Sequence, residues 1–402
     1  MRGGGRWSAI FATFANGGFS IYFFGQVVSN TGTWFQNLAL SLVVLETTGS
    51  AQSLGGVTAA QFLPLLFLSI PAGWLADRVR PRTILLTTSS ASAVVVGLLA
   101  VVTLDPEPVV GNIYALVAVL GTFHAFERVA AQAIIYEIVG PAALTRAVSL
   151  STIAVASARS IGPGLAGLAF QGLGATACMA INSASFFLVF VSIVLIRPSR
   201  LRPRSRRARG DAGASSLWRN GPLVTLLVVN AVIALLALNL MLVLTSTVTL
   251  TFGGSAEAVG AVHALNAVGA ILGGLLATGR ASTSVRALSG ACAGLGAALL
   301  LNAAAPSLPI MLMLAPVLGL GIGYFQGVLY AAAQGAVPPA QIGRAMSLVM
   351  LGNYGMMPFG AILLGGVIDL SSGHVALLVG GIASSACAVF VAVRLRRPRR
   401  DG

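Results

Sequence analysis

The stretch Gly73-Trp74-Leu75-Ala76-Asp77-Arg78-Val79-Arg80-Pro81-Arg82 decides how this chain folds. It is a dense cluster of charge between two uncharged apolar runs, Gln61–Ala76 and Thr83–Leu104. A helix of about 20 apolar residues is long enough to cross a bilayer. The charged stretch is therefore expected at a membrane surface, in the turn between two spanning helices.

Composition indicates an all-α membrane protein. The chain has 402 residues, of which 56% are hydrophobic and 8% are charged. A water-soluble domain carries about 25% charged residues, and a transmembrane barrel needs alternating segments of about 10 residues, which this sequence lacks. The net charge of +14 comes with no basic domain interleaved with aromatic residues, so we expect no nucleic-acid partner.

Apolar length and helix-breaking residues predict twelve spans in two pseudo-symmetric six-helix bundles. The predicted spans are 18–45, 54–76, 83–104, 112–136, 147–170, 175–196, 223–250, 259–278, 288–304, 309–333, 345–368 and 375–393. The domains expected are an N-terminal bundle at 1–196, a basic cytoplasmic linker at 197–219, and a C-terminal bundle with a basic tail at 220–402. All the basic residues are Arg, and they recur on alternate loops. This pattern places both termini in the cytoplasm.

The two halves repeat. Residues 139–167 match residues 337–365 at a constant offset of 198, with pairs such as Arg146/Arg344 and Gly162/Gly360. The aligned pieces contain the loop before the fifth and eleventh spans and most of each span. Two six-span halves related by a parallel repeat are a known plan of secondary transporters.

The order Gly-x-Leu-Ala-Asp-Arg at Gly73–Arg78 resembles the loop between the second and third helices of the major facilitator superfamily. The resemblance implies that Asp77 and the nearby Arg78 and Arg82 latch the two halves in the outward-facing state. Gly73 would permit close approach of a helix. Glu137, at the end of the fourth span, is expected to bind an Arg of this group. The alternative is a plain basic loop.

The fifth span carries Gly162, Pro163 and Gly167 within the stretch Arg159–Gly167. Glycine removes side-chain bulk and proline bends a helix, so we expect a closely packed hinge here. The stretch resembles the Gly-Pro motif of the superfamily's exporters, which implies export. A packing kink without directional meaning is the alternative.

Polar residues lie along one face of the first span, at Gln26, Asn30, Thr33 and Asn37. Such a stripe is expected to face a water-filled cavity; hydrogen bonding between helices is the alternative. The flanking residues 29–37 and 48–51 resemble the macrolide- and enterobactin-exporter branch of drug/proton antiporters. Further candidates for the substrate cavity are His124, Asn230, His263, Gln326 and Tyr330.

Glu127 lies deep in the fourth span, where an unpaired carboxylate is costly. Arg128 and Arg159 are the other charges at comparable depth. We therefore expect Glu127 to exchange a proton during transport, with Arg128 or Arg159 setting its affinity. A static ion pair between Glu127 and Arg159 is an equal alternative. Arg128 and Gln132 do not fit the Arg-x-x-Gln-Gly signature of antiporters.

Several classes of protein are excluded or disfavoured. The chain has no Lys, and so no phosphate-binding Gly-x-x-x-x-Gly-Lys loop for ATP. Its three cysteines lie in apolar runs without metal-ligand spacing. No arrangement of nucleophile and base points to an enzyme. We expect no catalytic residues, no cofactor and no metal.

The sequence is therefore identified as a twelve-helix carrier that exports small hydrophobic or amphipathic compounds, with H⁺ as the coupling ion. Its expected partners are the substrate and the lipid bilayer, and it is expected to act as a monomer in a bacterial inner membrane. Two alternatives remain open: a proton- or sodium-coupled importer of a metabolite, and a receptor or assembly factor that keeps the fold without transporting.

Overall fold

The computed structural model is helical throughout its described residues, which are 13–201, 217–218, 220–278, 285–338 and 341–396. A few side chains within these ranges are also not described, including that of Arg159. Most of the predicted basic linker lies outside the described residues. Among those that are described, nine helices are long and apolar enough to cross a membrane. This number of helices is typical of a multi-pass membrane protein.

Helices account for each of the twelve predicted spans. The helices that cover the first six are α2 (Gly17–Thr48), α3 (Ala51–Arg78), α4 (Pro81–Val102), α5 (Val110–Val139) and α6 (Pro141–Leu195). Those that follow are α8 (Gly221–Leu236), α9 (Leu240–Ser246), η2 (Thr247–Thr251), α10 (Ala256–Thr278), α11 (Val285–Ala303), α12 (Leu308–Gly335), α13 (Ile342–Leu370) and α14 (Gly373–Arg396). A short 3₁₀ turn, η1, covers Pro198–Arg200.

Glycines separate neighbouring spans where the backbone leaves the helical region. Gly174, with φ 81° and ψ 176°, interrupts α6 between the predicted fifth and sixth spans. Gly140, with φ 72° and ψ 178°, ends α5 immediately before Pro141 opens α6. A side chain is strained in this region of φ and ψ, whereas glycine adopts it freely. The two glycines thus explain where the chain turns.

The seventh span differs from its prediction, because it is not one uninterrupted helix over 223–250. It breaks after Leu236, resumes as α9, and ends in the π-helical turn η2. Asn239 is buried at this break and donates weakly to the carbonyl oxygens of Ala234 and Leu235, at 3.3 and 3.4 Å. Its amide satisfies carbonyl groups that the interrupted helix leaves without partners, as a break inside a membrane requires.

The chain forms two compact units, whose described residues fall within Met1–Leu40 with Leu63–Arg209, and within Ser41–Phe62 with Gly210–Gly402. Residues 41–62, from the end of α2 and the first half of α3, therefore group with the second unit. The division into bundles at 1–196 and 220–402, joined by a linker at 197–219, stays a prediction.

In the first unit, an apolar core joins four helices. Phe19 from α2, Leu85 from α4, Ile134 from α5 and Ile193 from α6 are all at most 1% exposed. Where a helix borders water, burial of such apolar side chains is the main source of its packing free energy. Where it borders lipid, the packing free energy comes from close van der Waals contact between the helices. The α4 helix packs against both α5 and α6.

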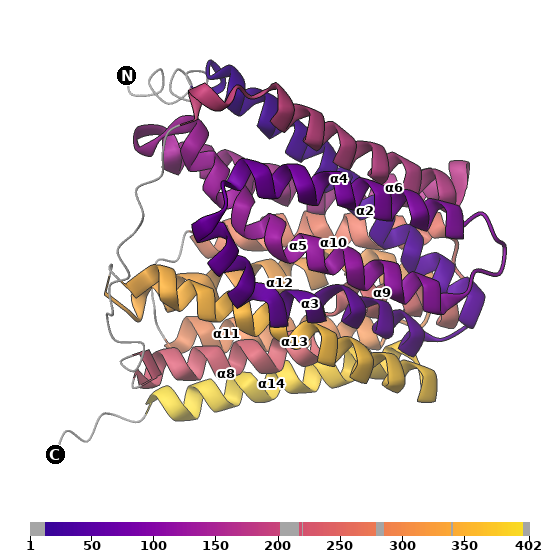
Figure 1. Cartoon of the computed structure of the whole chain (residues 1–402). Coiled ribbons are helices and arrows are strands. Elements are labelled where there is room, and N and C mark those ends of the chain that lie inside the picture. The colour runs from indigo at the N-terminus through magenta and orange to yellow at the C-terminus, as the bar shows by residue number, and fades with distance from the viewer. Residues whose placement is uncertain (1–12, 202–216, 219, 279–284, 339–340, 397–402) are drawn as a thin grey trace, which may run out of the picture. The chain divides into compact units, whose positions relative to one another are not determined.

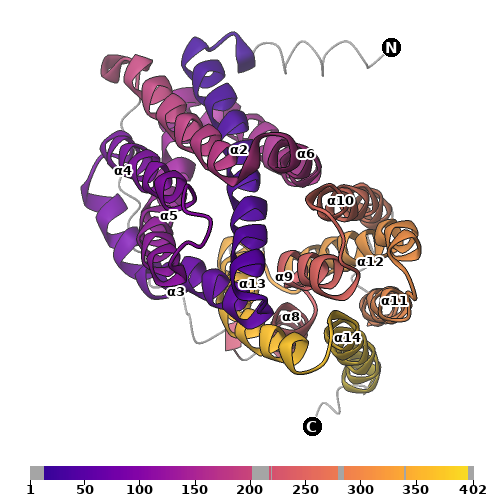
Figure 2. The same ribbon diagram turned by 90° about the vertical axis from the view of Figure 1, so that its right-hand side faces the viewer.

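In the second unit, glycines bring α10 and α12 into backbone contact. A Cβ at Gly269 or Gly273 of α10 would overlap the carbonyl oxygen of Pro316 or Leu320, respectively. Reciprocally, Gly319 and Gly323 of α12 approach α10 too closely for a side chain. Both pairs follow Gly-x-x-x-Gly spacing, which lets helices approach in a bilayer. Figure 2 views these helices end-on, with α10 beside α12 and α12 beside α11.

The remaining helices of the second unit pack as neighbours along their lengths. Figure 1 shows α8 beside α14, and α11 also packs against α14. The α13 helix packs against α8, where a Cβ at Gly360 would overlap the carbonyl oxygen of Leu235. In the first unit the repeat partner Gly162 packs against Trp34 of α2, whose Cβ lies 2.7 Å from the position of an added Cβ. The two repeated glycines thus admit equivalent neighbours, the first and seventh spans.

Candidate functional site

The predicted polar stripe of α2 is partly accessible along its length. Gln26, Asn30, Thr33 and Asn37 are each intermediate in exposure. Asn30 donates to the carbonyl oxygen of Gln26 at 2.7 Å, and Thr33 donates to that of Ser29 at 2.9 Å. These bonds to the preceding turn each use one donor of the side chain. The role of the stripe in substrate binding remains a prediction.

Glu127 of α5 shares its surroundings with residues of α2. The Tyr22 side chain lies near that of Gln26 and interacts electrostatically with the Glu127 carboxylate. The Tyr22 hydroxyl also lies 3.5 Å from the carbonyl oxygen of Ala131. Gln26 Nε2 is buried with no hydrogen-bond partner among the described residues. The first unit therefore combines an acid, a phenol and an unused amide donor.

Two further predicted residues flank Glu127 on its helix. His124 packs its ring against Phe186 of α6 at 5.8 Å between centroids, and it lies within electrostatic range of Arg128. Arg128 also interacts with Glu127 and is itself exposed. The side chain of Arg159 lies outside the described part, so the predicted Glu127–Arg159 pair has no structural test. Arg128 is the described basic residue that acts on Glu127.

A buried network that the sequence analysis missed lies beside the stripe. Asn182 of α6 donates to Gln36 Oε1 at 2.7 Å, and Ser185 donates to Asn182 Oδ1 at 2.9 Å. Gln36 and Asn182 are at most 1% exposed. A Cβ at Gly32 would lie 2.7 Å from both Asn182 Oδ1 and Ser185 Oγ, so glycine admits this network. Gln36 is adjacent to Asn37 in the chain, but the helix turns it toward α6.

The predicted hinge contains one close contact that explains its glycine. Gly162 contacts the Trp34 side chain, as described above, while Pro163 lies inside α6 without ending the helix. Gly167 also lies within α6. The close packing expected at Gly162 is confirmed, but bending during transport remains a prediction.

In the second unit, polar side chains gather between α8, α12 and α13. Asn230 is fully buried and donates to the carbonyl oxygen of Val349 at 2.8 Å. Asn353 Nδ2 lies 3.4 Å from the hydroxyl of Tyr330. The Oδ1 atoms of Asn230 and Asn353 are buried and accept no hydrogen bond from a described residue. Of this cluster, the sequence analysis had proposed Asn230 and Tyr330 for the substrate cavity, and that role stays a prediction.

The other candidates of the second unit have different surroundings. His263 is buried, and its Nε2 lies 3.0 Å from Thr245 Oγ1 of α9, so it joins α10 to the broken seventh span. Gln326 of α12 is intermediate in exposure. The contact of His263 is a structural one, and its predicted contact with substrate is untested.

The charged stretch predicted as a turn lies mostly in helix, at the end of α3 and the start of α4, and it shows two contacts. The guanidinium carbon of Arg78 lies 3.6 Å from the ring centroid of Trp74, and Arg82 donates to the carbonyl oxygen of Val194 at 3.3 Å. Asp77 is exposed and hydrogen-bonds no other described residue. A Cβ at Gly73 would meet no described atom within 4 Å, so the predicted close helix approach at Gly73 is not found.

Glu137, the remaining member of the predicted latch, is 9% exposed at the end of α5. It takes part in an interaction within the protein. Beside it, Asn16 donates to the carbonyl oxygen of Ile138 at 3.1 Å and accepts from the backbone N–H groups that open α2. The end of α5 is thus fastened to the start of α2.

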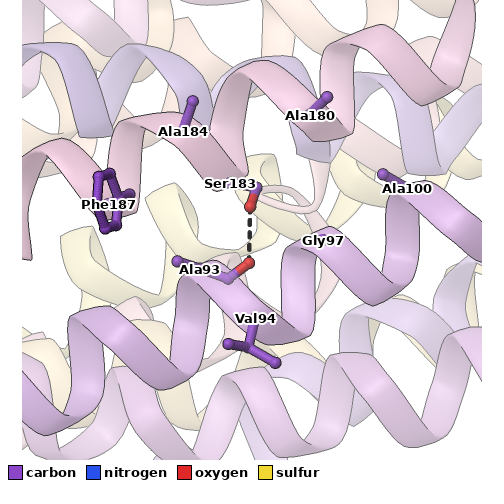
Figure 3. Close-up of a pocket in the computed structure, with 8 residues that line it drawn as sticks. All are labelled: Ala93, Val94, Gly97, Ala100, Ala180, Ser183, Ala184 and Phe187. Carbon is purple, nitrogen blue, oxygen red and sulfur yellow. Dashed lines mark hydrogen bonds between the residues drawn. The ribbon is translucent and has the colours of Figure 1, made fainter.

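A groove of about 590 Å³ lies between α4 and α6 in the first unit. Figure 3 shows its lining residues, Ala93, Val94, Gly97, Ala100, Ala180, Ser183, Ala184 and Phe187. The hydroxyl group that lines this groove belongs to Ser183, and it already donates to the carbonyl oxygen of Ala93 at 2.7 Å. Polar groups that orient a ligand are what a specific site needs. This groove therefore lacks a free polar side chain that could orient a ligand.

Metal binding finds no support in the part of the chain that is described. Its residues contain no group of three His, Cys, Asp or Glu side chains that could hold an ion. Cys178, Cys292 and Cys387 are free and buried.

Comparison with known families identifies the class of this molecule. The model of the family described as "Transmembrane secretion effector" matches residues 8–402. The chain belongs to this family of the major facilitator superfamily. Its members carry small molecules across membranes, so the protein is a membrane transporter and the resemblance inferred from the sequence is confirmed.

Individual relatives agree with this assignment. The chain is 25% identical to the multidrug efflux pump Tap of Mycolicibacterium fortuitum, over 88% of this chain and 90% of that protein. It is 22% identical to macrolide efflux protein A of Streptococcus pyogenes, over 84% and 86% of the two chains. A shorter match to the staphyloferrin A transporter of Staphylococcus aureus is 33% identical and spans 34% of this chain and 35% of that protein.

Solved structures show the same fold. The nucleoside transporter NupG aligns with a TM-score of 0.70 and 14% identity, covering 95% of this chain and 100% of that one. An auto-inhibited POT family peptide transporter aligns with a TM-score of 0.72 and 14% identity, covering 95% and 97%. At this level of identity the likeness shows the fold alone.

Proposed function

We propose that this transporter exports small hydrophobic or amphipathic compounds from a bacterial cell, and that entry of a proton drives each cycle through Glu127. The observation that carries the proposal is the grouping of Glu127 with Tyr22 and Gln26 in the first unit. A carboxylate among membrane helices is costly unless it is functional or paired. Here its described surroundings include a phenol and a buried amide donor without a partner.

The proposed substrate class is supported by the polar groups found within each unit. Gln26 Nε2 offers a donor in the first unit, and the Oδ1 atoms of Asn230 and Asn353 offer acceptors in the second. Amides and phenols orient bulky neutral or cationic compounds by hydrogen bonds while apolar side chains bind most of their surface. Export is supported by the named relatives, which include a multidrug efflux pump and a macrolide efflux protein.

Coupling requires that one group change its protonation as the carrier changes shape. In the proposed cycle, Glu127 takes up a proton from outside and loses it to the cytoplasm, and its charge alters the interaction with Tyr22 and Arg128. Arg128 interacts electrostatically with Glu127, so a movement of its guanidinium relative to the carboxylate would change how readily Glu127 exchanges a proton.

The test uses purified protein in liposomes with a fluorescent cationic dye. Glu127→Gln should abolish accumulation driven by a pH gradient but retain exchange of dye against dye, which needs no net proton movement. Glu127→Asp should recover part of the driven flux. Glu107→Gln, at an exposed acid before α5, serves as the matched control and should behave as the wild type.

Two outcomes would contradict this role for Glu127. Full driven flux by Glu127→Gln at every pH would remove it as the coupling group. Loss of exchange together with driven flux, in a protein that remains folded, would show a structural role instead. A susceptibility screen in an efflux-deficient bacterium, with and without an uncoupler, identifies compounds for the assay.

A further inference from the structure

A carboxylate at the end of α13 fastens the turn between α2 and α3. Asp369 Oδ1 accepts from the backbone N–H of Ala51 at 2.6 Å, and Oδ2 accepts from that of Gln52 at 3.0 Å. Ser50 Oγ also donates to Oδ2, at 2.5 Å. Both carboxylate oxygens are therefore engaged by the turn, although Asp369 is separated from it by more than 300 residues of chain.

The physical basis of this contact is the start of a helix. The first N–H groups of α3 have no partner within their own helix, and they form its positive end. Ser50 accepts one of them, from Ser53 at 3.1 Å. Asp369 accepts the N–H groups of Ala51 and Gln52 and supplies a full negative charge. The two residues together cap α3, one from its own chain segment and one from α13.

Below the cap, α3 and α13 pack with their backbones close together. A Cβ at Gly365 would lie 2.7 Å from both the carbonyl oxygen of Ala51 and the Cα of Gln52. A Cβ at Gly55 would overlap the carbonyl oxygen of Ala361. Further along, the rings of Phe62 and Tyr354 stack with centroids 6.1 Å apart. The contact thus runs antiparallel over about 18 Å of helix at 1.5 Å per residue.

The position of this contact in the chain gives it a consequence for transport. Residues 41–62 group with the second unit, while the rest of α2 and α3 groups with the first. The turn is therefore the point at which the first two spans are attached to α13. Any cycle that separates the ends of these spans from α13 has to break the bonds to Asp369.

We propose that Asp369 is a latch that holds the α2–α3 turn to α13 and is released each time the carrier opens outward. The loops at Glu46 and Asp369 both lack Arg, which assigns them to the outer side. The α3 helix then has a carboxylate at each end, Asp369 capping its start and Asp77 near its cytoplasmic end. In this structure Asp369 accepts hydrogen bonds from the α2–α3 turn, whereas Asp77 contacts no described partner. Two latches that close in alternation would show this pattern, with one formed and the other open. This inference rests on the proposed alternating transport.

Opening of the turn is measured by thiol labelling, which needs no substrate. In a background without the three native cysteines, Ala51→Cys provides a reporter, because Ala51 is fully buried beneath the latch. A membrane-impermeant maleimide is added to intact cells. Asp369→Asn keeps the size of the side chain but loses its charge and one acceptor, and should raise the labelling rate about tenfold. Ser50→Ala removes one donor and should raise it less.

The control is Asp105→Asn, at another acid on an Arg-free loop. Asp105 accepts only locally among the described residues, from the N–H of Glu107 at 3.0 Å, so its neutralisation should leave labelling unchanged. An unchanged rate in both Asp369→Asn and Ser50→Ala would overturn the latch. Labelling that occurs only in inside-out vesicles would overturn its placement on the outer side.

The need for release is tested by a disulfide. A Cβ at Gly366 would lie 4.0 Å from Gln52 Cδ, so Gln52→Cys with Gly366→Cys can be oxidised across the contact. Oxidation should stop dye flux and a reductant should restore it, whereas full flux in the cross-linked protein would overturn the proposal. If the reduced protein transports none of the screened compounds, the proposed function fails, and the labelling rates still decide whether Asp369 holds the turn.

Discussion

Two adjacent glycines of α10 should respond in opposite ways to the same substitution. Gly273 faces α12, where an added Cβ would overlap the carbonyl oxygen of Leu320 and lie 2.7 Å from the N atom of Tyr324. Gly274 has no atom within 4 Å of the same position. We expect Gly273→Ala to destabilise the second unit and Gly274→Ala to leave it intact or stabilise it.

The magnitude follows from the packing. Inserting a methyl group into a closely packed interface costs about 1–3 kcal/mol. Separating the helices by about 1 Å to relieve the overlap would lose up to half of the dispersion energy of the affected contacts. At Gly274 the same change gains about 0.5–1 kcal/mol, because alanine loses less backbone freedom than glycine in a helix. Gly273→Ala has the same backbone gain, so the two variants should differ by the packing cost alone, about 1–3 kcal/mol.

The native cysteines provide the assay. Cys178, Cys292 and Cys387 are free and buried, so a thiol-reactive fluorogenic dye reports unfolding in detergent as the temperature rises. The Tm of Gly273→Ala should lie at least about 2 °C below that of Gly274→Ala, given about 2–4 °C per kcal/mol for a unit of this size. Gly274→Ala should not lower it. Equal shifts for the two variants would refute the assignment of Gly273 to the α10–α12 contact.

Three further substitutions test contacts in both units. Gly162→Ala should destabilise the first unit, because the added methyl group would overlap Trp34. Adding Trp34→Ala should recover at least about 1 kcal/mol of the free energy of unfolding in a double-mutant cycle. Additive effects of the two substitutions would show that the residues do not touch. Asn182→Ala leaves Gln36 Oε1 buried without its donor and should cost about 1–3 kcal/mol, a loss that Ser183→Ala should not match. Asn220 caps α8 by accepting from the N–H of Leu223 at 3.1 Å and donates to the carbonyl oxygen of Ala336 at 2.7 Å. Its replacement by Ala should cost about 0.5–2 kcal/mol in chemical unfolding, and an unchanged midpoint would contradict the cap.

The candidate site was only partly visible in the sequence. Helical spacing placed Gln26, Asn30, Thr33 and Asn37 on one face, and the structure leaves all four partly accessible. The same spacing gave no reason to single out Gln36, whose partner Asn182 lies 146 positions away. The sequence analysis missed Asn353 for the same reason. What marks this residue is the contact of its Nδ2 with the Tyr330 hydroxyl and the burial of its Oδ1 without a donor, and neither is visible in the sequence.

The amino-acid sequence by itself determined the helical membrane class, the family and most of the helix ends. Each of these depends on a local property of the chain. The length of the apolar runs determined the membrane class, glycines such as Gly140 and Gly174 determined helix ends, and a short charged motif indicated the family. Tertiary structure alone decided that Gly273 faces a helix while Gly274 does not, that residues 41–62 group with the second unit, and that Asp369 caps α3. Such contacts join positions far apart in the chain, and they depend on which faces of two helices meet, which helical periodicity does not specify.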